Sequence, residues 1–209
     1  MKILAIGAHF DDVELGCGGS LAAHAARGDE VYVYVATVSG FNNYQNQSVR
    51  SSTVARTEAE EAMQIIGAKQ MFCGEFKTLE VEFVDTLNIQ ILQLVDQLGI
   101  DQVYTHWAGD IHHDHQAVAR ASLHSCRHVK RLLMYRSNWY HSTVEFKCHF
   151  YVDITNYWNV KEAAIRAHQS EINRTGLNWI NFFRNEAENA GQRIGVPLAE
   201  VFEVVKWLC

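Results

Sequence analysis

Short apolar runs rich in β-branched and aromatic residues alternate with segments of helical periodicity through the first two thirds of the chain. The runs predict strands at Ile3–Gly7, Val31–Val38, Gln70–Gly74, Gln102–His106 and Leu132–Arg136. The periodic segments predict helices at Gly18–Arg27, Thr53–Ile66, Thr86–Leu98 and His115–Cys126. This βαβα order predicts an α/β fold, a Rossmann-like and mostly parallel sheet with helices on both faces.

The last third of the chain does not follow this alternation of strands and helices. It predicts a strand at Phe146–Ile154, helices at Asn159–Glu171 and Asn178–Asn189, and a final apolar stretch at Val201–Trp207. No repeat or proline-rich linker separates this part from the rest. A chain of 209 residues with 48% hydrophobic content has enough material for one core, so we expect residues 1–209 to form a single domain.

Composition narrows the class of protein. The formal charge of -6, without a long basic run, disfavours nucleic acid or an anionic membrane surface as the main partner. No apolar stretch approaches the ~20 residues of a membrane span, and the N-terminus does not resemble a signal peptide. Five widely spaced cysteines without a CxxC pair indicate reduced thiols. We therefore expect a soluble cytoplasmic protein that acts on a small molecule, with a homo-oligomer compatible with the sequence.

Three polar residues follow the first predicted strand. His9 and Asp12, three positions apart in a tight turn, can supply two of the roughly three protein ligands that a water-activating metal needs. Asp11, between them, is then free to act as a base. The alternative is that the two aspartates only cap the following helix. Capping explains one aspartate, but not the second one or His9.

The glycines that follow, Gly16, Gly18 and Gly19, weakly resemble a dinucleotide-binding loop. In that motif the glycines come directly after the strand, whereas a charged segment intervenes here. Close packing of a helix explains them better.

A second polar cluster follows the strand Gln102–His106. His115 can give a third imidazole to the metal, while His112 faces the same pocket from one turn away. Asp114 can accept a hydrogen bond from His112 and so fix its tautomer. An N-cap of the following helix is the ordinary alternative for Asp114. Since the carboxyl ends of parallel strands form the ligand-binding edge of such sheets, the two clusters are predicted to form one site.

The two clusters resemble the motifs of a known family. The segment AHFDDVELGCGGSL is similar to the AHPDDxE signature of the LmbE/PIG-L zinc-dependent de-N-acetylases, and THWAGDIHHDHQAVARA resembles their HxDH block. The resemblance implies zinc, or ferrous iron in the cell, held by ligands from both blocks. It also implies that Asp11 is the general base and that His112, oriented by Asp114, stabilises the oxyanion. The implied ligands are His9, Asp12 and His115.

The resemblance also implies a role for Arg56, which matches an arginine that grips a hydroxyl group of the substrate. A solvated helix arginine beside Glu58 and Glu60 is the alternative. One departure from the family pattern is Phe10, which stands where proline is usual and does not stiffen the turn as proline would. Phe10 is expected either to loosen the turn or to pack beside the substrate. The polar loop Ser39–Ser52 is a candidate substrate loop.

These observations predict a metal-dependent hydrolase that removes an N-acyl group, most simply N-acetyl, from an amino sugar or a related small conjugate. Two other classes stay open at this point. One is a metal-dependent phosphoesterase, which commonly places two metal ions ~3.5–4 Å apart and needs more carboxylate ligands. The other is a non-enzymatic nucleotide-binding α/β module, which would bind no metal.

Overall fold

A computed structural model describes residues 1–209 and contains a seven-stranded sheet in the order β5-β2-β1-β6-β7-β9-β8. The first five strands of that order are parallel, whereas β9 runs antiparallel to both of its neighbours. The strands are β1 (Lys2–Gly7), β2 (Glu30–Thr37), β5 (Gln70–Phe76), β6 (Gln102–His106), β7 (Arg131–Tyr135), β8 (Phe150–Asp153) and β9 (Ala199–Trp207).

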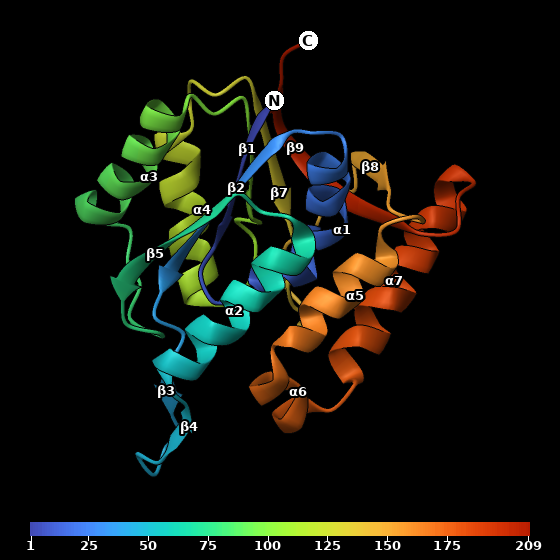
Figure 1. Ribbon diagram of the computed structural model, residues 1–209. Coiled ribbons are helices and arrows are strands. Elements are labelled where there is room, and N and C mark those ends of the chain that lie inside the picture. The colour runs from blue at the N-terminus through green and yellow to red at the C-terminus, as the bar shows by residue number, and fades with distance from the viewer.

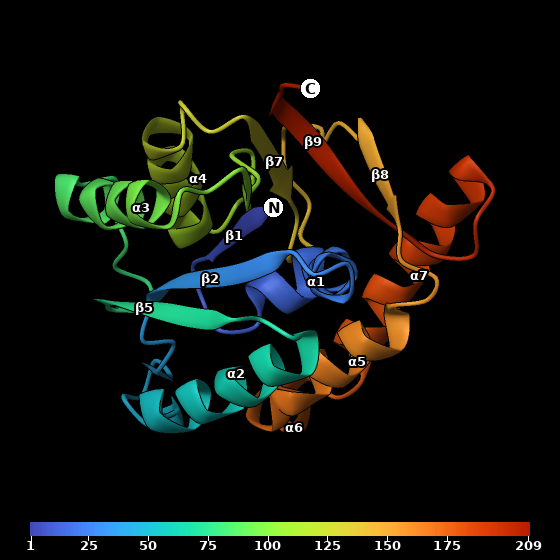
Figure 2. The same ribbon diagram turned by 45° about the horizontal axis from the view of Figure 1, so that its top comes forward.

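Helices cover both faces of this sheet (Figures 1 and 2). On one face α1 (Asp12–Ala26), α2 (Ser52–Ile66) and α5 (Trp158–Ala167) contribute to a core of 19 buried residues. On the other face α3 (Asp85–Leu98) and α4 (His113–Ser125) contribute to a core of 18. Strand residues therefore bury side chains on both sides, which is why the central strands read as continuous apolar runs. The predicted fold class is confirmed.

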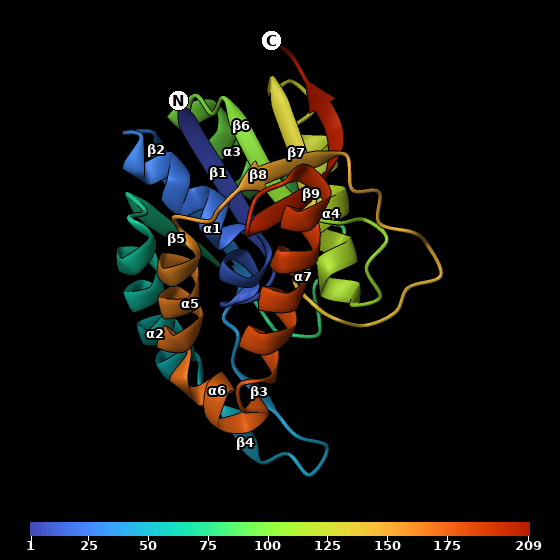
Figure 3. The same ribbon diagram turned by 90° about the vertical axis from the view of Figure 1, so that its right-hand side faces the viewer.

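The C-terminal part extends the sheet and adds α6 (Gln169–Thr175) and α7 (Asn178–Ile194) beside α5. The single helix predicted over Asn159–Glu171 was wrong, because the chain bends at His168, whose ψ of 61° ends α5. Helix α1 begins at Asp12, well before the predicted start at Gly18. The loop Ser39–Ser52 contains a small hairpin, β3 (Phe41–Asn42) and β4 (Ser48–Arg50), which projects from the body of the molecule (Figure 3).

The pairing of β1 with β6 sets the position of the two polar clusters. Ile3 pairs with Gln102 and Ala5 with Tyr104 in parallel register, so the two strands end side by side at one edge of the sheet. From β1 the chain proceeds outward through β2 to β5, and it returns to the other side of β1 with β6 and β7. The β1–β6 boundary is therefore the topological switch point, where open α/β sheets bind ligands. None of the helices combines the length and apolar composition needed to cross a membrane.

The glycines of α1 are explained by close packing, as the sequence indicated. An added methyl group on Gly16 would lie 2.0 Å from the ring of Tyr135, and one on Gly19 would lie 2.9 Å from Ile154. At Gly18 the nearest neighbour would be a side-chain carbon of Lys161 at 3.5 Å, an ordinary contact. Tyr135 cannot move away easily, because it is fully buried and its hydroxyl donates a hydrogen bond to the carbonyl of Ile6.

We predict that Gly16→Ala lowers the free energy of unfolding by about 1–3 kcal/mol, the usual range for overpacking a tight core. Gly18→Ala is the matched control in the same helix. It should leave stability unchanged or raise it by up to about 1 kcal/mol, since alanine favours helix interiors. Urea unfolding of both variants checks this, and equal midpoints would contradict the packing explanation.

Candidate metal centre

The turn after β1 holds its three polar residues in different ways. The Asp12 carboxylate accepts hydrogen bonds from the backbone N–H groups of Ala8 (3.1 Å) and His9 (2.7 Å), so it folds back over the end of the strand. Asp11 occupies the N-cap position of α1 with a φ of 121°, but its side chain makes no capping hydrogen bond. Helix capping therefore does not explain the Asp11 side chain.

The second cluster surrounds the start of α4. Asp110 accepts a hydrogen bond from the backbone N–H of His112 and contacts Nδ1 of His115 at 3.0 Å. The side-chain amide of Asn138 adds two further hydrogen bonds to the same carboxylate. Asp110 is thus fixed by three neighbours and in turn fixes the plane of the His115 ring.

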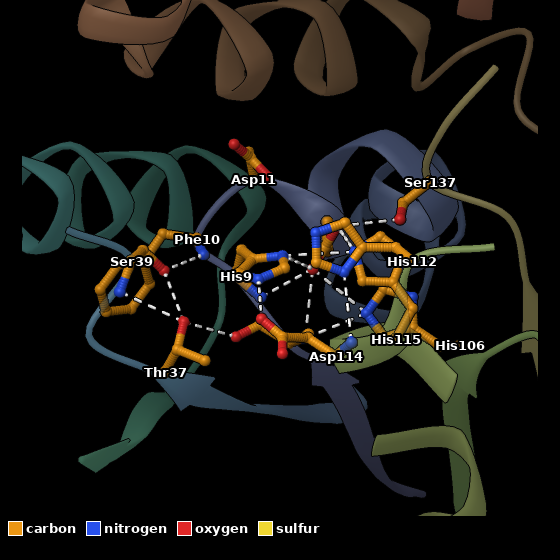
Figure 4. Close-up of polar contacts among 12 residues, drawn as sticks. His9, Phe10, Asp11, Thr37, Ser39, His106, His112, Asp114, His115 and Ser137 are labelled. Atoms are coloured by element: carbon orange, nitrogen blue, oxygen red, sulfur yellow. Dashed lines mark hydrogen bonds and ion pairs between the residues drawn. The ribbon is translucent and has the colours of Figure 1, made fainter. Parts of the chain in front are cut away.

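His9, Asp12 and His115 converge between the two clusters, and Figure 4 shows the rings of His9 and His115 at this point. The Nδ1 atom of His9 lies 3.3 Å from Nε2 of His115 and 3.4 Å from Asp12 Oδ2, and His115 Nε2 lies 3.3 Å from Asp12 Oδ1. The other nitrogen of each ring contacts a carboxylate: His9 Nε2 meets Asp114 at 2.8 Å, and His115 Nδ1 meets Asp110. Because the outer nitrogen of each neutral ring then carries the proton, the inner nitrogen presents a lone pair to the centre.

These distances suit a single metal ion. Tetrahedral zinc with ligands at roughly 2.0–2.1 Å requires ligand atoms about 3.3 Å apart. The two histidine nitrogens have this separation, and each lies at a similar distance from a different oxygen of the Asp12 carboxylate. Two imidazoles and one carboxylate are also a donor set that zinc accepts while keeping a position open for water. His9, Asp12 and His115 could therefore hold such an ion.

Without a metal ion the same atoms favour protons. Burial alone would lower the pKa of His9, but its contacts with Asp114 and Asp12 outweigh burial and raise the pKa to about 9. Burial is likewise outweighed at His115, where Asp12 and Asp110 raise the pKa to about 10. Although burial opposes it, the neighbouring His115 and His106 hold the pKa of Asp12 well below its usual range. A metal ion must therefore compete with protons for both histidines.

His112 faces the same centre but is oriented differently from the prediction. Its Nδ1 accepts a hydrogen bond from the backbone N–H of Asp114 at 3.2 Å, so His112 is the N-cap of α4. The Asp114 carboxylate instead contacts His9 and accepts hydrogen bonds from the backbone N–H groups of Leu79 and Val81. The predictions that Asp114 orients His112 and that it caps α4 were therefore wrong, because the loop before α3 and His9 occupy its oxygens.

The charge state of His112 follows from its surroundings. Burial, together with His115 and His9, lowers its pKa to about 4, so the ring is neutral near pH 7. With Nδ1 accepting from the backbone, Nε2 carries the ring proton. His112 can therefore donate one hydrogen bond from Nε2.

Asp11 is the carboxyl group of the site with the fewest partners. Its one polar contact in the protein is with Arg50, whose Nη1 lies 3.6 Å from Asp11 Oδ2. Burial and the neighbouring Asp12 raise the pKa of Asp11 to about 7, against the lowering effect of Arg50. In Figure 4 the Asp11 carboxyl points away from the labelled histidine rings.

A cavity of about 280 Å³ opens over these groups. His9, Asp11, Asp12, His112 and His115 form its floor, and Ser39, Phe41 and Arg50 bring the hairpin segment to its wall. Trp139, Tyr140 and Trp179 line it as well, with Trp139 packed edge-on against Trp179. Trp107, which follows β6, does not line this cavity and is buried against Phe146.

Two expectations about neighbouring residues fail. Arg56 is exposed on α2 and does not line the cavity; the arginines that do are Arg50 and Arg174. Phe10 does not meet the cavity, since it is 1% exposed within the core. Its backbone N–H donates a hydrogen bond to Ser39 Oγ at 2.8 Å, a bond that proline could not make.

Several residues of the site escaped sequence reasoning. Ser137 donates a hydrogen bond to Asp12 at 2.8 Å, and His106 contacts the same carboxylate at 3.1 Å. Ser137 follows the strand β7 and His106 ends β6, so the ends of the strands were the available signal. Asp110 lies inside the second motif, but the sequence alone assigns it no role.

Comparison with known proteins places the chain in a family. The model of PIG-L: GlcNAc-PI de-N-acetylase matches residues 4–126, a range that includes both polar clusters. The chain belongs to the PIG-L family. This confirms the resemblance seen in the motifs and makes deacetylation, a hydrolytic reaction, the activity of the family.

One curated relative and two solved structures illustrate the similarity of this PIG-L chain to known proteins in sequence and in fold. The uncharacterized deacetylase YaiS of Escherichia coli (strain K12) is 34% identical over 184 residues, covering 80% of this chain and 90% of YaiS. The conserved protein TT1542 from Thermus thermophilus shares the fold with a TM-score of 0.84, 23% identity, and coverage of 99% of this chain and 95% of TT1542. N,N'-diacetylchitobiose deacetylase from Pyrococcus horikoshii gives a TM-score of 0.83, 21% identity, and coverage of 98% and 83%.

We predict that metal binding releases protons, because His9 and His115 are protonated at neutral pH when no metal competes. Displacing one to two protons should raise the apparent zinc affinity by about 10- to 100-fold for each pH unit between pH 6 and 8. The increase should level off as the pH passes the values of about 9 and 10 for His9 and His115. Calorimetric titration with zinc in buffers of different ionisation enthalpy measures both the number of protons released and the apparent zinc affinity. A zinc affinity that does not change with pH would contradict the prediction that protons on His9 and His115 compete with the metal.

Proposed function

We propose that the protein is a zinc-dependent de-N-acylase that hydrolyses an N-acyl group, most simply N-acetyl, from an amino sugar or a sugar-containing small molecule. One observation carries the proposal. Two imidazole lone pairs and the Asp12 carboxylate meet at separations of 3.3–3.4 Å, in a cavity that also exposes Asp11, a carboxyl group outside the ligand set. Metal ligands and a separate proton acceptor are the two requirements of a metal-assisted hydrolase.

In this proposal His9, Asp12 and His115 hold zinc, with ferrous iron as the alternative in the cell. The ion would supply a Lewis acid that polarises the acyl oxygen and lowers the pKa of water from 15.7 toward ~7. Asp114 and Asp110 keep the two imidazoles in the ligating tautomer, and Ser137 holds the Asp12 carboxylate by a hydrogen bond. Substitution of such outer carboxylates commonly lowers metal affinity or activity by about 10- to 100-fold.

Asp11 is proposed to move the protons. Its raised pKa, about 7, suits a group that takes a proton from water and later returns it to the leaving nitrogen, since general acid–base groups work best near the operating pH. The return step falls to Asp11 rather than to His112, because a pKa of about 4 leaves His112 without a second proton at neutral pH. The neutral His112 instead donates its Nε2–H to the developing oxyanion.

The wall of the cavity supports a ring-shaped polar substrate. Trp139, Tyr140 and Trp179 present aromatic surface to the cavity, while the guanidinium group of Arg174 lines it as well. The P. horikoshii neighbour, by its name, deacetylates N,N'-diacetylchitobiose, an acetylated amino sugar. We infer an N-acetylated sugar or sugar conjugate as the substrate class.

A phosphoesterase with two metal ions is a weaker interpretation of the same residues. The additional carboxylates it would need are Asp110 and Asp114, and each is already held by a histidine ring and by backbone N–H groups. The three possible ligand groups of the site also all contain His9 or His115. A second ion would have to take a ligand from the first.

We further propose that residues 1–209 act as one domain in the cytoplasm. The cavity takes residues from the turn after β1, from the hairpin β3–β4, from α4 and from α6, so segments from both ends of the chain build one site. All five cysteines are free thiols, which suits a reducing compartment.

We predict a graded response to substitution at the site. Asp11→Asn and His112→Ala should retain about one zinc per chain while lowering kcat, by roughly 10²–10⁴-fold for the base and 10²–10³-fold for the oxyanion donor. His9→Ala and Asp12→Ala should lose the metal itself. Metal analysis and turnover of the same preparations separate the two groups of variants. Near-normal turnover of Asp11→Asn would exclude Asp11 as the base.

The substrate class is tested with a panel of N-acetylated monosaccharides, N-acetylated disaccharides, sugar nucleotides and a phosphate monoester. We expect amine release from at least one acetylated sugar, its loss on treatment with a chelator, and its recovery on addition of zinc. Turnover of the phosphate ester with about two metal ions per chain would instead favour the phosphoesterase. Absence of any metal dependence would overturn the proposal.

A further inference from the structure

We propose that Arg50 is a positioning residue that holds the general base Asp11 in its working orientation. The inference rests on the proposed function and adds to it a residue that neither sequence motif contains. Arg50 reaches the site from β4 of the projecting hairpin, far along the chain from Asp11, and its side chain is 3% exposed. An arginine buried this deeply needs a reason, because its charge must be matched by neighbouring groups.

The two terminal nitrogens of Arg50 have different partners. Nη1 faces the turn after β1, where it donates a hydrogen bond to the carbonyl of Phe10 at 3.2 Å and lies 3.6 Å from Asp11 Oδ2. Nη2 faces away from the turn, donating to Glu58 Oε2 at 2.9 Å and to Nδ1 of His168 at 3.1 Å. The guanidinium group of Arg50 thus links Asp11 and the carbonyl of Phe10 to two supporting residues, Glu58 and His168.

The support is itself rigidly held. Glu58 of α2 accepts hydrogen bonds from both the backbone N–H and the hydroxyl of Ser170, each at 2.6 Å. Since Nδ1 of His168 accepts from Arg50, its Nε2 carries the proton and donates to Glu14 of α1 at 2.8 Å. The bend at His168, which divides α5 from α6, places this ring beside Arg50. Residues of helices α1, α2 and α6 therefore fix the orientation of the Arg50 guanidinium group.

The Asp11 side chain, in contrast, makes no hydrogen bond within the turn. A φ of 121° at a non-glycine residue costs of order 1–3 kcal/mol and persists only where surrounding contacts maintain it. The Asp11 side chain makes no capping hydrogen bond, and Arg50 is its one polar protein partner. Arg50 contacts both the carbonyl of Phe10, just before the strained residue, and the carboxylate of the strained residue itself. It is thus placed to keep the carboxylate turned toward the cavity.

Lysine cannot reproduce this arrangement. It keeps the positive charge but has a single nitrogen at its end, whereas the guanidinium of Arg50 uses two nitrogens that point in different directions. Arg50→Lys therefore tests geometry at constant charge. Arg56→Lys, an exposed arginine on the neighbouring helix α2, is the matched control.

A different role is direct contact with the substrate. Arg50 lines the cavity, and its Nε has no hydrogen-bond partner in the protein. A residue that grips the substrate would mainly change KM, whereas a residue that aims the base changes kcat. The two roles also differ in their dependence on Asp11. An effect exerted through the base must disappear once the base is removed.

The experiment is a double-mutant cycle of Arg50→Lys with Asp11→Asn, assayed on the acetylated sugar that the wild-type protein cleaves best. We expect Arg50→Lys to lower kcat by about 10²-fold, the usual effect of misplacing a catalytic group by about 1 Å, with KM changed by less than about threefold. In the Asp11→Asn background the same change should have an effect of less than about twofold. Zinc content should equal that of the wild type, and Arg56→Lys should behave as the wild type.

Three results would overturn the inference. One is a higher KM with an unchanged kcat, which indicates substrate binding. Another is an equal loss from Arg50→Lys in both backgrounds, which indicates a role independent of Asp11. The third is a normal kcat per folded, zinc-loaded molecule, with only a lower thermal midpoint, which indicates a structural role alone. Failure of the proposed function is distinct from all of these, because the wild-type protein would then release no amine from any substrate.

Discussion

Two carboxylates outside the proposed ligand set, Asp114 and Asp110, orient the two histidine rings of the centre. Each contacts the outer nitrogen of one imidazole, at 2.8 Å for His9 and 3.0 Å for His115, and thereby turns the inner lone pair toward Asp12. Without these contacts the two rings could present N–H groups to each other, and no metal site would exist. The oxygens of Asp114 and Asp110 are themselves fixed by backbone N–H groups from neighbouring loops. The position of the loops therefore sets the tautomer of the ligands.

This arrangement separates two functions that the motif places side by side in the sequence. Asp12 is covered by the N–H groups of Ala8 and His9 and by Ser137, so its charge is stabilised and its position is constant. Asp11 has no such hydrogen bonds and keeps a raised pKa. Two adjacent aspartates thus differ because the strained backbone at Asp11 sends their side chains in different directions. The proposed roles, metal ligation by Asp12 and proton transfer by Asp11, need this difference.

Much of the fold and of the centre could be predicted from sequence, for identifiable reasons. The apolar runs of β1, β2 and β6 are unambiguous because both of their faces are buried, and the order of elements then requires the ends of β1 and β6 to meet. His9, Asp12 and His115 follow directly from that edge. The break at His168 could not be predicted, because it depends on a ring buried between Glu14 and Arg50, which are distant in sequence. Arg50 was missed for the same reason, while Arg56 matched a motif but points into solvent.

X-ray absorption spectroscopy at the zinc edge tests the central claim most directly, because it reports the ligand types and the number of ions without requiring a substrate. The account predicts about one zinc ion per chain, with two imidazole nitrogens at roughly 2.0–2.1 Å and oxygen ligands completing the shell. A sulfur ligand near ~2.3 Å, or a second metal ion at ~3.5–4 Å, would contradict it.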